Sequence, residues 1–352
     1  MLHALARCVA FALLAAGFAP APDRLAEEVQ RCVALAADKQ TSEEFSSSVR
    51  SSSVAPLQQV EADLAAGRRF AALHRFASLR INLEGVRYVD GLAADKRDEE
   101  AFEAEWKSVG ERLARHGSRA AQLRGIANAA LRAEAEATLP QAGILREASL
   151  EYARSTEPKF GLFYLGSALA ADDFVDLCAS LDVHSDKRPP SLRSVRAEID
   201  ALQQELLAAY KPPLSVERHS AFIGASSALK EARALDAQGR PYGALLRMLT
   251  AAARCEMLLD SSPAPTTEGL AYLIDSNATR IEAGDVDHSI AQVFLELARA
   301  EVAAAPGTSP PIAVAIAKRS LPLYFRALRP AEPTAEPARA EVDLTLVRWP
   351  FT

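Results

Sequence analysis

Two short clusters in this sequence combine aspartate with histidine, side chains that commonly bind metal ions. They are Asp182, His184 and Asp186, followed by Asp285, Asp287 and His288. The first cluster falls in the polar segment 182–190, where a turn explains the same residues. The second stands where a helix should begin, and acidic residues there cap the first turn and complement the helix dipole. We favour these structural explanations, so the sequence predicts no metal site.

Carboxylates are also grouped at helical spacing, a pattern that would suit the acid pair of a glycosidase. The groups are Glu99, Glu100, Glu103 and Glu105, and then Asp172, Asp173 and Asp176. A run of charge on an amphipathic helix is usually its solvated face, which we favour here. The sequence contains no GxSxG, GxGxxG or HExxH motif and no Walker loop. We therefore assign no catalytic residue and no cofactor, and an enzyme is the less favoured class.

Four arginines recur at matching positions. Arg68 and Arg240 each follow a glycine, and Arg75 and Arg247 come seven residues later. Side chains seven residues apart lie on one face of a helix. They would either line a groove that holds an acidic peptide or another carboxylate, or pair with acids on a neighbouring helix. We favour pairing, and we keep all four as candidate partner-binding residues.

The segments that contain these arginines align with each other. GRRFAALHRFASL at 67–79 matches GRPYGALLRMLTA at 239–251, an offset of 172 residues (239 − 67). The glycine at the start tolerates a left-handed turn, and the small Ala72 and Ala244 would let two antiparallel helices approach closely. We predict an internal duplication of a helical module.

The order of a turn glycine, a small residue and then a bulky one, Phe76 or Met248, resembles the second helix of a tetratricopeptide repeat. The resemblance covers only the 13 residues of each segment, 67–79 and 239–251. It implies tetratricopeptide-like helical hairpins with a concave face that binds peptides or partner proteins.

The N-terminus has the layout of a secretory signal peptide. Arg7 precedes the uncharged apolar run CVAFALLAAGFA at 8–19, and small residues follow up to Ala21. The run is shorter than the roughly 20 residues that cross a bilayer, so we expect no transmembrane span. Pro20 or Pro22 would follow the cleavage site, so an uncleaved N-terminal tether and a misplaced start codon stay as alternatives to the cleavage that we favour.

The C-terminus differs from the rest. RPAEPTAEPA at 329–338 is typical of a Pro-rich extended linker, and EVDLTLVRWPFT at 341–352 alternates apolar and polar residues before Trp349 and Phe351. Such a tail would dock across its own helical body or be recognised by another protein through strand addition. We favour self-docking, because an exposed Trp and Phe would be sticky. Trp349 and Phe351 are therefore candidate partner-binding residues as well.

Composition limits the classes of partner and of fold. The net charge is −6, and loss of Arg7 with residues 1–21 makes it −7 (−6 − 1). A mildly acidic chain without a basic run is a poor binder of nucleic acid. Ala and Leu dominate, which favours helix. Cys32, Cys178 and Cys255 would remain after cleavage, either as small buried residues, which we favour, or with two of them in a disulfide.

Apolar residues spaced by three and four predict helices along most of the chain. We expect an all-α fold of antiparallel helical hairpins, as an α-solenoid or an irregular helical bundle with an extended C-terminal tail. Pro140 should close one helix, and Ser191 should cap the next strong one, which carries Leu192. The expected organisation is a signal peptide at 1–21, a helix and Ser-rich linker at 22–53, helical modules at 54–181 and 191–328, and the Pro-rich linker and tail at 329–352.

These features predict an exported helical-repeat protein that is periplasmic or secreted. It would act as a protein- or peptide-interaction scaffold in the cell envelope. The alternatives are a helical hydrolase or lyase and a small-ligand-binding protein, each with its site in a groove between helices. A groove with several histidines and acids would favour the enzyme, and a groove lined with Arg, Tyr and Asn but without acids would favour peptide binding. A closed apolar cavity would favour the small-ligand-binding protein.

Overall fold

The computed structural model describes residues 23–38, 44–93, 97–115, 119–181, 187–210, 218–259 and 263–328. These residues form an all-α fold without a strand, which confirms the predicted fold class. The helices are α2 (Arg24–Ala37), α3 (Glu44–Ala65), α4 (Arg69–Asp90), α5 (Glu99–Arg115), α6 (Ala120–Gly125), α7 (Ala129–Ser155), α8 (Pro158–Leu181), α9 (Arg196–Ala209), α10 (His219–Ala237), α11 (Pro241–Leu259), α12 (Thr267–Glu282), α13 (Ser289–Ala304), α14 (Pro311–Ala315), the π-helical turn η3 (Ile316–Ser320) and α15 (Leu321–Ala327).

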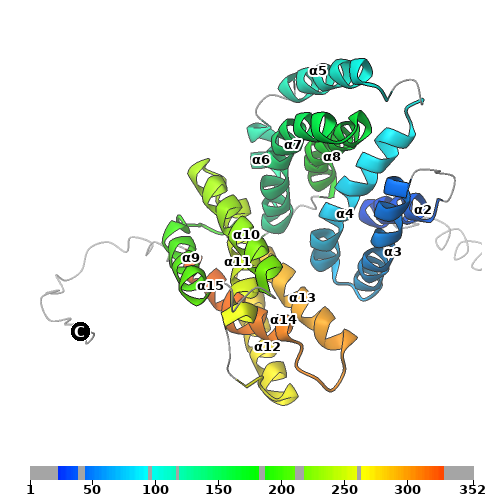
Figure 1. The fold of residues 1–352 in the computed structure, drawn as a ribbon. Helices are drawn as coiled ribbons and strands as arrows, with labels where there is room; N and C mark the ends of the chain where they lie inside the picture. The colour runs from blue at the N-terminus through cyan, green and yellow to red at the C-terminus, as the bar shows by residue number, and fades with distance from the viewer. Residues whose placement is uncertain are drawn as a thin grey trace, which may run out of the picture.

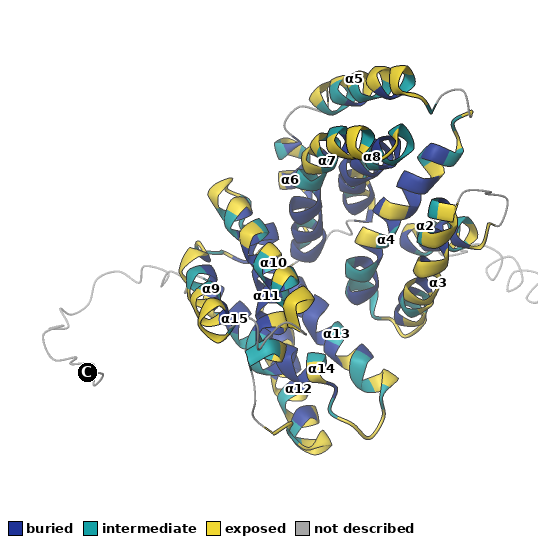
Figure 2. Cartoon of the chain, viewed as in Figure 1, coloured by how far each residue is buried: buried dark blue, intermediate teal, exposed yellow. Residues whose placement is uncertain are grey.

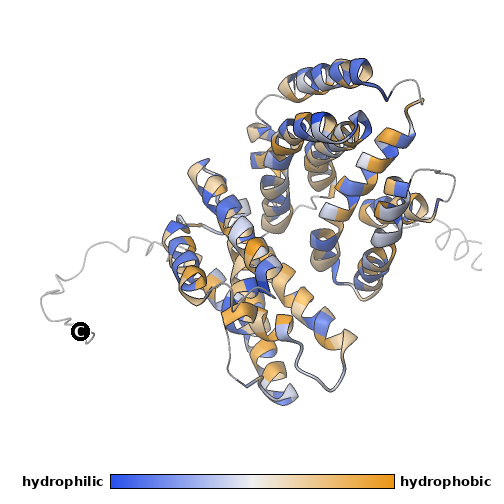
Figure 3. Cartoon of the chain, in the orientation of Figure 1, coloured by the Kyte–Doolittle hydropathy of each residue, from blue (hydrophilic) through white to orange (hydrophobic). Residues whose placement is uncertain are grey.

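The helices gather into an N-terminal half, α2 to α8, and a C-terminal half, α9 to α15 (Figure 1). Successive helices pack as the pairs α3–α4, α7–α8 and α10–α11. The halves meet where α11 packs on α7 and where α13 packs on α4 and α7. Helix α11 is largely buried, whereas α5 is mostly exposed (Figure 2). The helices of the C-terminal half around α13 are mainly hydrophobic (Figure 3).

Buried carboxylates join the two halves by capping helices across the interface. Glu296 of α13 accepts hydrogen bonds from the backbone amides of Phe70, at 2.8 Å, and Ala71, at 3.0 Å, in the first turn of α4. In the other direction, Glu136 of α7 accepts one from the amide of Gly243, at 3.0 Å, in the first turn of α11. These amides have no partner within their own helix, so each half supplies a cap that the other lacks.

The Ser-rich segment is helical, so the predicted linker is wrong over residues 44–53, which begin α3; residues 39–43 lie outside the described part of the chain. Tertiary contacts explain the difference. The buried guanidinium of Arg50 pairs with Asp90 at 2.6 Å and donates to the carbonyl of Leu35 at 2.6 Å. The hydroxyl of Ser46 also donates to Asp90. These bonds hold a weak helix-forming sequence against α4 and α2.

Pro140 does not close a helix, contrary to the sequence prediction. Helix α7 runs through it from Ala129 to Ser155, and the residues before it form the separate short helix α6. Proline in a helix interior removes one backbone hydrogen bond and costs about 3 kcal/mol. The packing of α7 on α8, its main partner in the fold, offsets that cost.

The helix expected from Ser191 begins later, at Arg196. Leu192 instead forms a β-bridge with Leu328 at the end of α15. The amide of Val195 donates to the carboxylate of Asp236 at 3.3 Å, which holds the segment before α9 against the end of α10.

The three cysteines Cys32, Cys178 and Cys255 are free and buried, as favoured from the sequence. Burial raises the pKa of Cys32 to about 12 and the pKa of Cys255 to about 11. Their thiols therefore stay protonated at neutral pH and pack as small apolar groups.

Candidate functional site: a groove at Arg240

The turn before α4 holds its arginine in a buried ion-pair network. Gly67 has φ +73°, and the amide of Arg68 donates to the carbonyl of Asp63 at 2.8 Å. The Arg68 guanidinium contacts the carboxylate of Asp63 at 2.9 Å, and the Arg75 guanidinium contacts the same carboxylate at 3.2 Å. The Asp63 side chain is fully buried. Arg75 also reaches across to Glu301 of α13 at 2.7 Å. Both arginines therefore stabilise the fold, which is the role that we favoured.

The turn before α11 has the same backbone and a different arginine environment. Gly239 has φ +69°, and the amide of Arg240 donates to the carbonyl of Leu235 at 3.0 Å. Arg247 pairs with Glu231 at 3.1 Å and reaches across to the carbonyl of Ala137 on α7. Leu235 stands where the first turn has Asp63, so the second turn has no carboxylate for Arg240.

The guanidinium of Arg240 makes no ion pair or hydrogen bond within the described part of the chain, and its Nη1 atom is buried. Several other arginines have one buried nitrogen without a hydrogen-bond partner, but each of them forms an ion pair through its guanidinium, as Arg50, Arg233 and Arg319 do. Burial lowers the pKa of Arg240, and the nearby carboxylate of Glu136 opposes that shift. The site therefore holds a positive charge that has no direct hydrogen bond or ion pair among the described residues.

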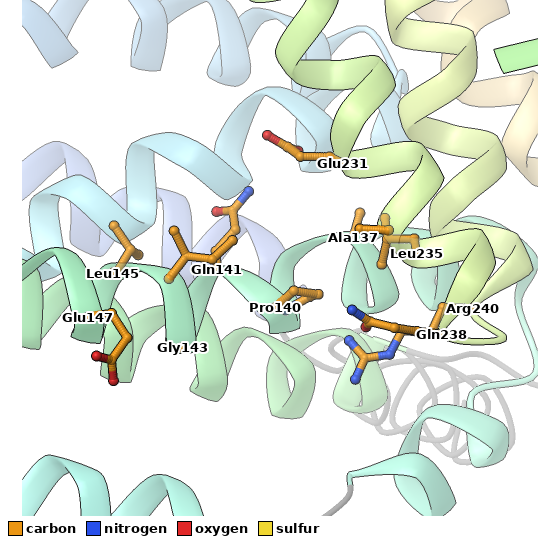
Figure 4. Close-up of a pocket in the computed structure, with 12 residues that line it drawn as sticks. Ala137, Pro140, Gln141, Gly143, Leu145, Glu147, Glu231, Leu235, Gln238 and Arg240 are labelled. Carbon is orange, nitrogen blue, oxygen red and sulfur yellow. The ribbon is translucent and has the colours of Figure 1, made fainter. Parts of the chain in front are cut away.

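Arg240 lies where two cavities adjoin, and we call their union the Arg240 groove. Its lobes share Gly143, Gln238 and Arg240. The apolar lobe, of about 840 Å³, lies between α7 and α10. The polar lobe, of about 440 Å³, extends toward α6 and α8. In Figure 4, Pro140, Gln141 and Leu145 of α7 face the apolar lobe from one side, and Glu231, Leu235, Gln238 and Arg240 stand on the other.

The α7 wall of the apolar lobe presents Pro140, Ile144 and Leu145. The side chain of Ile144 is 62% exposed, so a ligand in the lobe could contact it. Gly143 adds to the hollow, since a Cβ atom there would meet nothing within 4 Å.

Close contact between α11 and α7 positions Arg240 at the groove. A Cβ atom at Gly243 would lie only 2.8 Å from the Cβ of Glu136, so glycine allows the two helices to approach. The hydrogen bond from Gly243 to Glu136 then holds the first turn of α11 on α7. The guanidinium of Arg132 covers the ring of Tyr242 at 4.3 Å, which adds a cation–π contact at the same junction.

The carboxylates that line the groove are already engaged. Glu136 pairs with Arg132 at 2.8 Å, and Asp172 pairs with Arg119 at 2.6 Å. In the apolar lobe, Glu231 pairs with Arg247, and Glu147 pairs with Arg146 at 3.1 Å. The exposed Arg124 adds a further positive charge at the rim of the polar lobe. The charge that remains available to a ligand in the groove is therefore positive.

The other chemistry-bearing clusters have structural roles where they are described. Asp287 accepts hydrogen bonds from the amides of Ser289 and Ala129, so it caps α13 and α7 as its position before a helix indicated. Asp172 and Asp176 pair with Arg119, and Asp173 pairs with Arg112. Glu99, Glu100 and Glu103 are exposed on α5. No group of three or more His, Cys, Asp and Glu side chains in the described ranges is placed to hold a metal ion.

Several predicted residues lie outside the described part of the chain: Asp182, His184, Asp186, Trp349, Phe351 and the signal segment 1–21. The α7 wall of the groove was missed by sequence reasoning, because Pro140 suggested a helix end there. The difference between Arg68 and Arg240 was missed too, although comparing the residues five positions earlier, Asp63 and Leu235, would have revealed it.

Within the described ranges, no helix is both long and apolar enough to cross a bilayer. Comparison of the chain with protein-family models, curated proteins and solved structures found no match.

Proposed function

We propose that this chain is an exported protein- or peptide-binding module of the cell envelope, and that the Arg240 groove is its binding site. The observation that carries the proposal is the buried, unpartnered Nη1 of Arg240 at the junction of the two lobes. Export rests on the signal-like residues 1–21. The tetratricopeptide-like pattern at 239–251 begins at the groove, which Gly239 and Arg240 line, and it agrees with a peptide-binding role.

A carboxylate is the chemical group that fits Arg240. A buried donor without a partner costs about 1–3 kcal/mol, and a carboxylate from a ligand would recover that cost with a charge-assisted hydrogen bond. The apolar lobe beside it, of about 840 Å³, is in the size range of ligand pockets. We therefore expect an extended segment in which an acidic residue is next to apolar ones.

The lining of the groove favours binding over hydrolysis. No histidine is among its lining residues, and the acids there are held in ion pairs. A general acid or base would have to break such a pair before it could transfer a proton.

Selection from a library of random dodecapeptides displayed on phage would test the proposal. We expect the peptides that bind the full chain to carry Asp or Glu next to Leu, Ile, Val or Phe. A selected peptide, labelled with fluorescein, should bind the variant Arg240→Gln at least tenfold more weakly by fluorescence anisotropy, which is about 1.4 kcal/mol. Arg68→Gln is the matched control, because it removes the equivalent arginine away from the groove, and should change the affinity less than twofold. Selected peptides without an acidic preference, or equal binding to Arg240→Gln, would refute this function.

A further inference from the structure

The described chain ends close to the Arg240 groove. Leu328, the last described residue, forms a β-bridge with Leu192. Ser194, two residues after Leu192, donates a hydrogen bond from its hydroxyl to the carboxylate of Asp236 at 2.7 Å. Asp236 lies two residues before Gln238, which lines both lobes. The hydroxyl of Tyr242 donates to the carbonyl of Pro190 at 3.1 Å, which also holds this strand-like segment against the start of α11.

The chain that follows Leu328 is long enough to enter the groove. Residues 329–340 are twelve residues that include the Pro-rich linker. An extended polyproline-type segment of that length spans about 37 Å, at about 3.1 Å per residue. The path from Leu328 to Gln238 crosses the bridge to Leu192 and the hydrogen bond between Ser194 and Asp236. Its two remaining steps, 192 to 194 and 236 to 238, follow the chain for two residues each and span at most about 7 Å each. Residues 341 onward therefore come within reach of Arg240.

The sequence of that segment complements the two walls of the groove. In an extended chain, Glu341 and Asp343 lie on one face, and Val342, Leu344 and Leu346 lie on the other. Arg240 stands on the α10–α11 side of the groove, and the aliphatic wall with Pro140 and Ile144 stands on the α7 side. One face thus supplies the carboxylate that Arg240 lacks, while the other supplies side chains for the apolar lobe.

We infer that residues 341–347 of this chain occupy the Arg240 groove of the same molecule, with Asp343 on Arg240 and Val342, Leu344 and Leu346 against α7. The inference rests on the proposed function, and it names the chain's own tail as the resident peptide. An external partner then has to displace the tail. A tethered segment acts at an effective concentration in the millimolar range, so the tail weakens external binding without any change in the groove itself.

Disulfide trapping in the full chain tests the position of the tail. The variant Gln238→Cys/Thr345→Cys places one thiol at the junction of the lobes and one on the tail, and it keeps the carboxylate of Asp343. Ser52→Cys/Thr345→Cys is the control, because Ser52 is exposed on α3 in the other half. Under mild oxidation we expect the 238–345 bridge to form within one chain at least tenfold faster than the 52–345 bridge. Adding Arg240→Gln should slow the 238–345 bridge at least fivefold. Equal rates for the two pairs, or a bridge formed only between two chains, would overturn docking in the same molecule.

A second measurement separates failure of this inference from failure of the proposed function. The full-length variant Asp343→Lys/Leu344→Lys should bind the phage-selected peptide at least tenfold more tightly than the wild type, because its tail no longer competes. Unchanged affinity, together with binding that still depends on Arg240, would refute the tail as occupant and leave the groove as a peptide site. Binding to the Asp343→Lys/Leu344→Lys chain that is unaffected by adding Arg240→Gln would refute both, because no tail then competes.

Discussion

The turns at Gly67 and Gly239 have the same backbone, yet only the first satisfies its arginine. Both glycines have a positive φ, and both following amides donate to the carbonyl five residues earlier. In the first turn that earlier residue is Asp63, whose buried carboxylate binds Arg68 and Arg75. In the second turn it is Leu235, and Arg240 has no partner in the described chain. One substitution between otherwise similar turns thus separates a purely structural arginine from one available to a ligand.

The largest expected effect comes from making the first turn like the second. Asp63→Leu should lower the free energy of unfolding by about 3 kcal/mol, because it leaves two partly buried guanidinium groups without their shared carboxylate. Urea denaturation followed by circular dichroism measures this. Ala62→Leu, on the exposed face of the same helix turn, is the control and should change stability by less than about 0.5 kcal/mol. If Asp63→Leu lowers the free energy of unfolding by less than about 1 kcal/mol, the Asp63 carboxylate does not distinguish the two turns energetically.

Equivalent substitutions of the two arginines should differ in their cost. Arg68→Gln should lower stability by about 1.5 kcal/mol, since Asp63 keeps only Arg75. In the Asp343→Lys/Leu344→Lys background, which removes the proposed tail contact, Arg240→Gln should leave stability within about 0.5 kcal/mol of its parent, or raise it, because it removes a partly buried charge that has no partner among the described residues. The same urea titrations decide this, and similar losses for both arginine variants would show that Arg240 has a partner outside the tail.

The shared backbone predicts equal costs for the two glycines. Gly67→Ala and Gly239→Ala should each lower stability by about 1 kcal/mol, because a Cβ atom is strained at φ near +70° although nothing lies within 4 Å of either site. Gly125→Ala, which is equally uncrowded and lacks a positive φ, should cost nothing. Thermal melts of the three variants compare them, and a difference above about 1 kcal/mol between the first two would mean that the turns are not equivalent.

The smallest expected effect is a pH dependence at the cap of the first turn. Burial raises the pKa of Glu296 above 4.5, although the amides of Ala71 and Phe70 act to lower it. The folded chain therefore keeps this proton to higher pH than the unfolded chain does. The stability that Glu296 contributes is present below pH 4.5 and is lost as the pH rises through the folded pKa. Relative to Glu296→Gln, the wild type should lose stability in urea titrations as the pH rises above 4.5, and a constant or growing advantage would contradict this.

Much of the helical content follows from the sequence, because apolar periodicity reports which face of a helix is buried. The two aligned segments are helical as predicted, since α4 and α11 each begin two residues after the turn glycine. The failures occur where distant groups decide the local structure. Arg50 holds the Ser-rich segment in α3 through Asp90, and packing on α8 carries α7 through Pro140.

The candidate site was only partly predictable for the same reason. The four arginines could be named from their spacing, and three of them pair with acids as we favoured. The fourth, Arg240, is distinguished by Leu235 five residues earlier and by α7, which comes from the other half of the chain. Spacing identifies candidate residues, but the wall that α7 provides depends on tertiary packing that no local pattern encodes.

The exchange of helix caps between the halves bears on how this chain gains and loses its structure. With Glu296 capping α4 and Glu136 capping α11, neither half contains all the groups that its own first turns require. When only the N-terminal half has emerged from the ribosome, Glu296 has not yet been synthesised, so the first turn of α4 still lacks its cap. The two halves should unfold in a single transition despite their separate appearance, and two fragments cut between α8 and α9 should regain cooperative structure only when they are mixed.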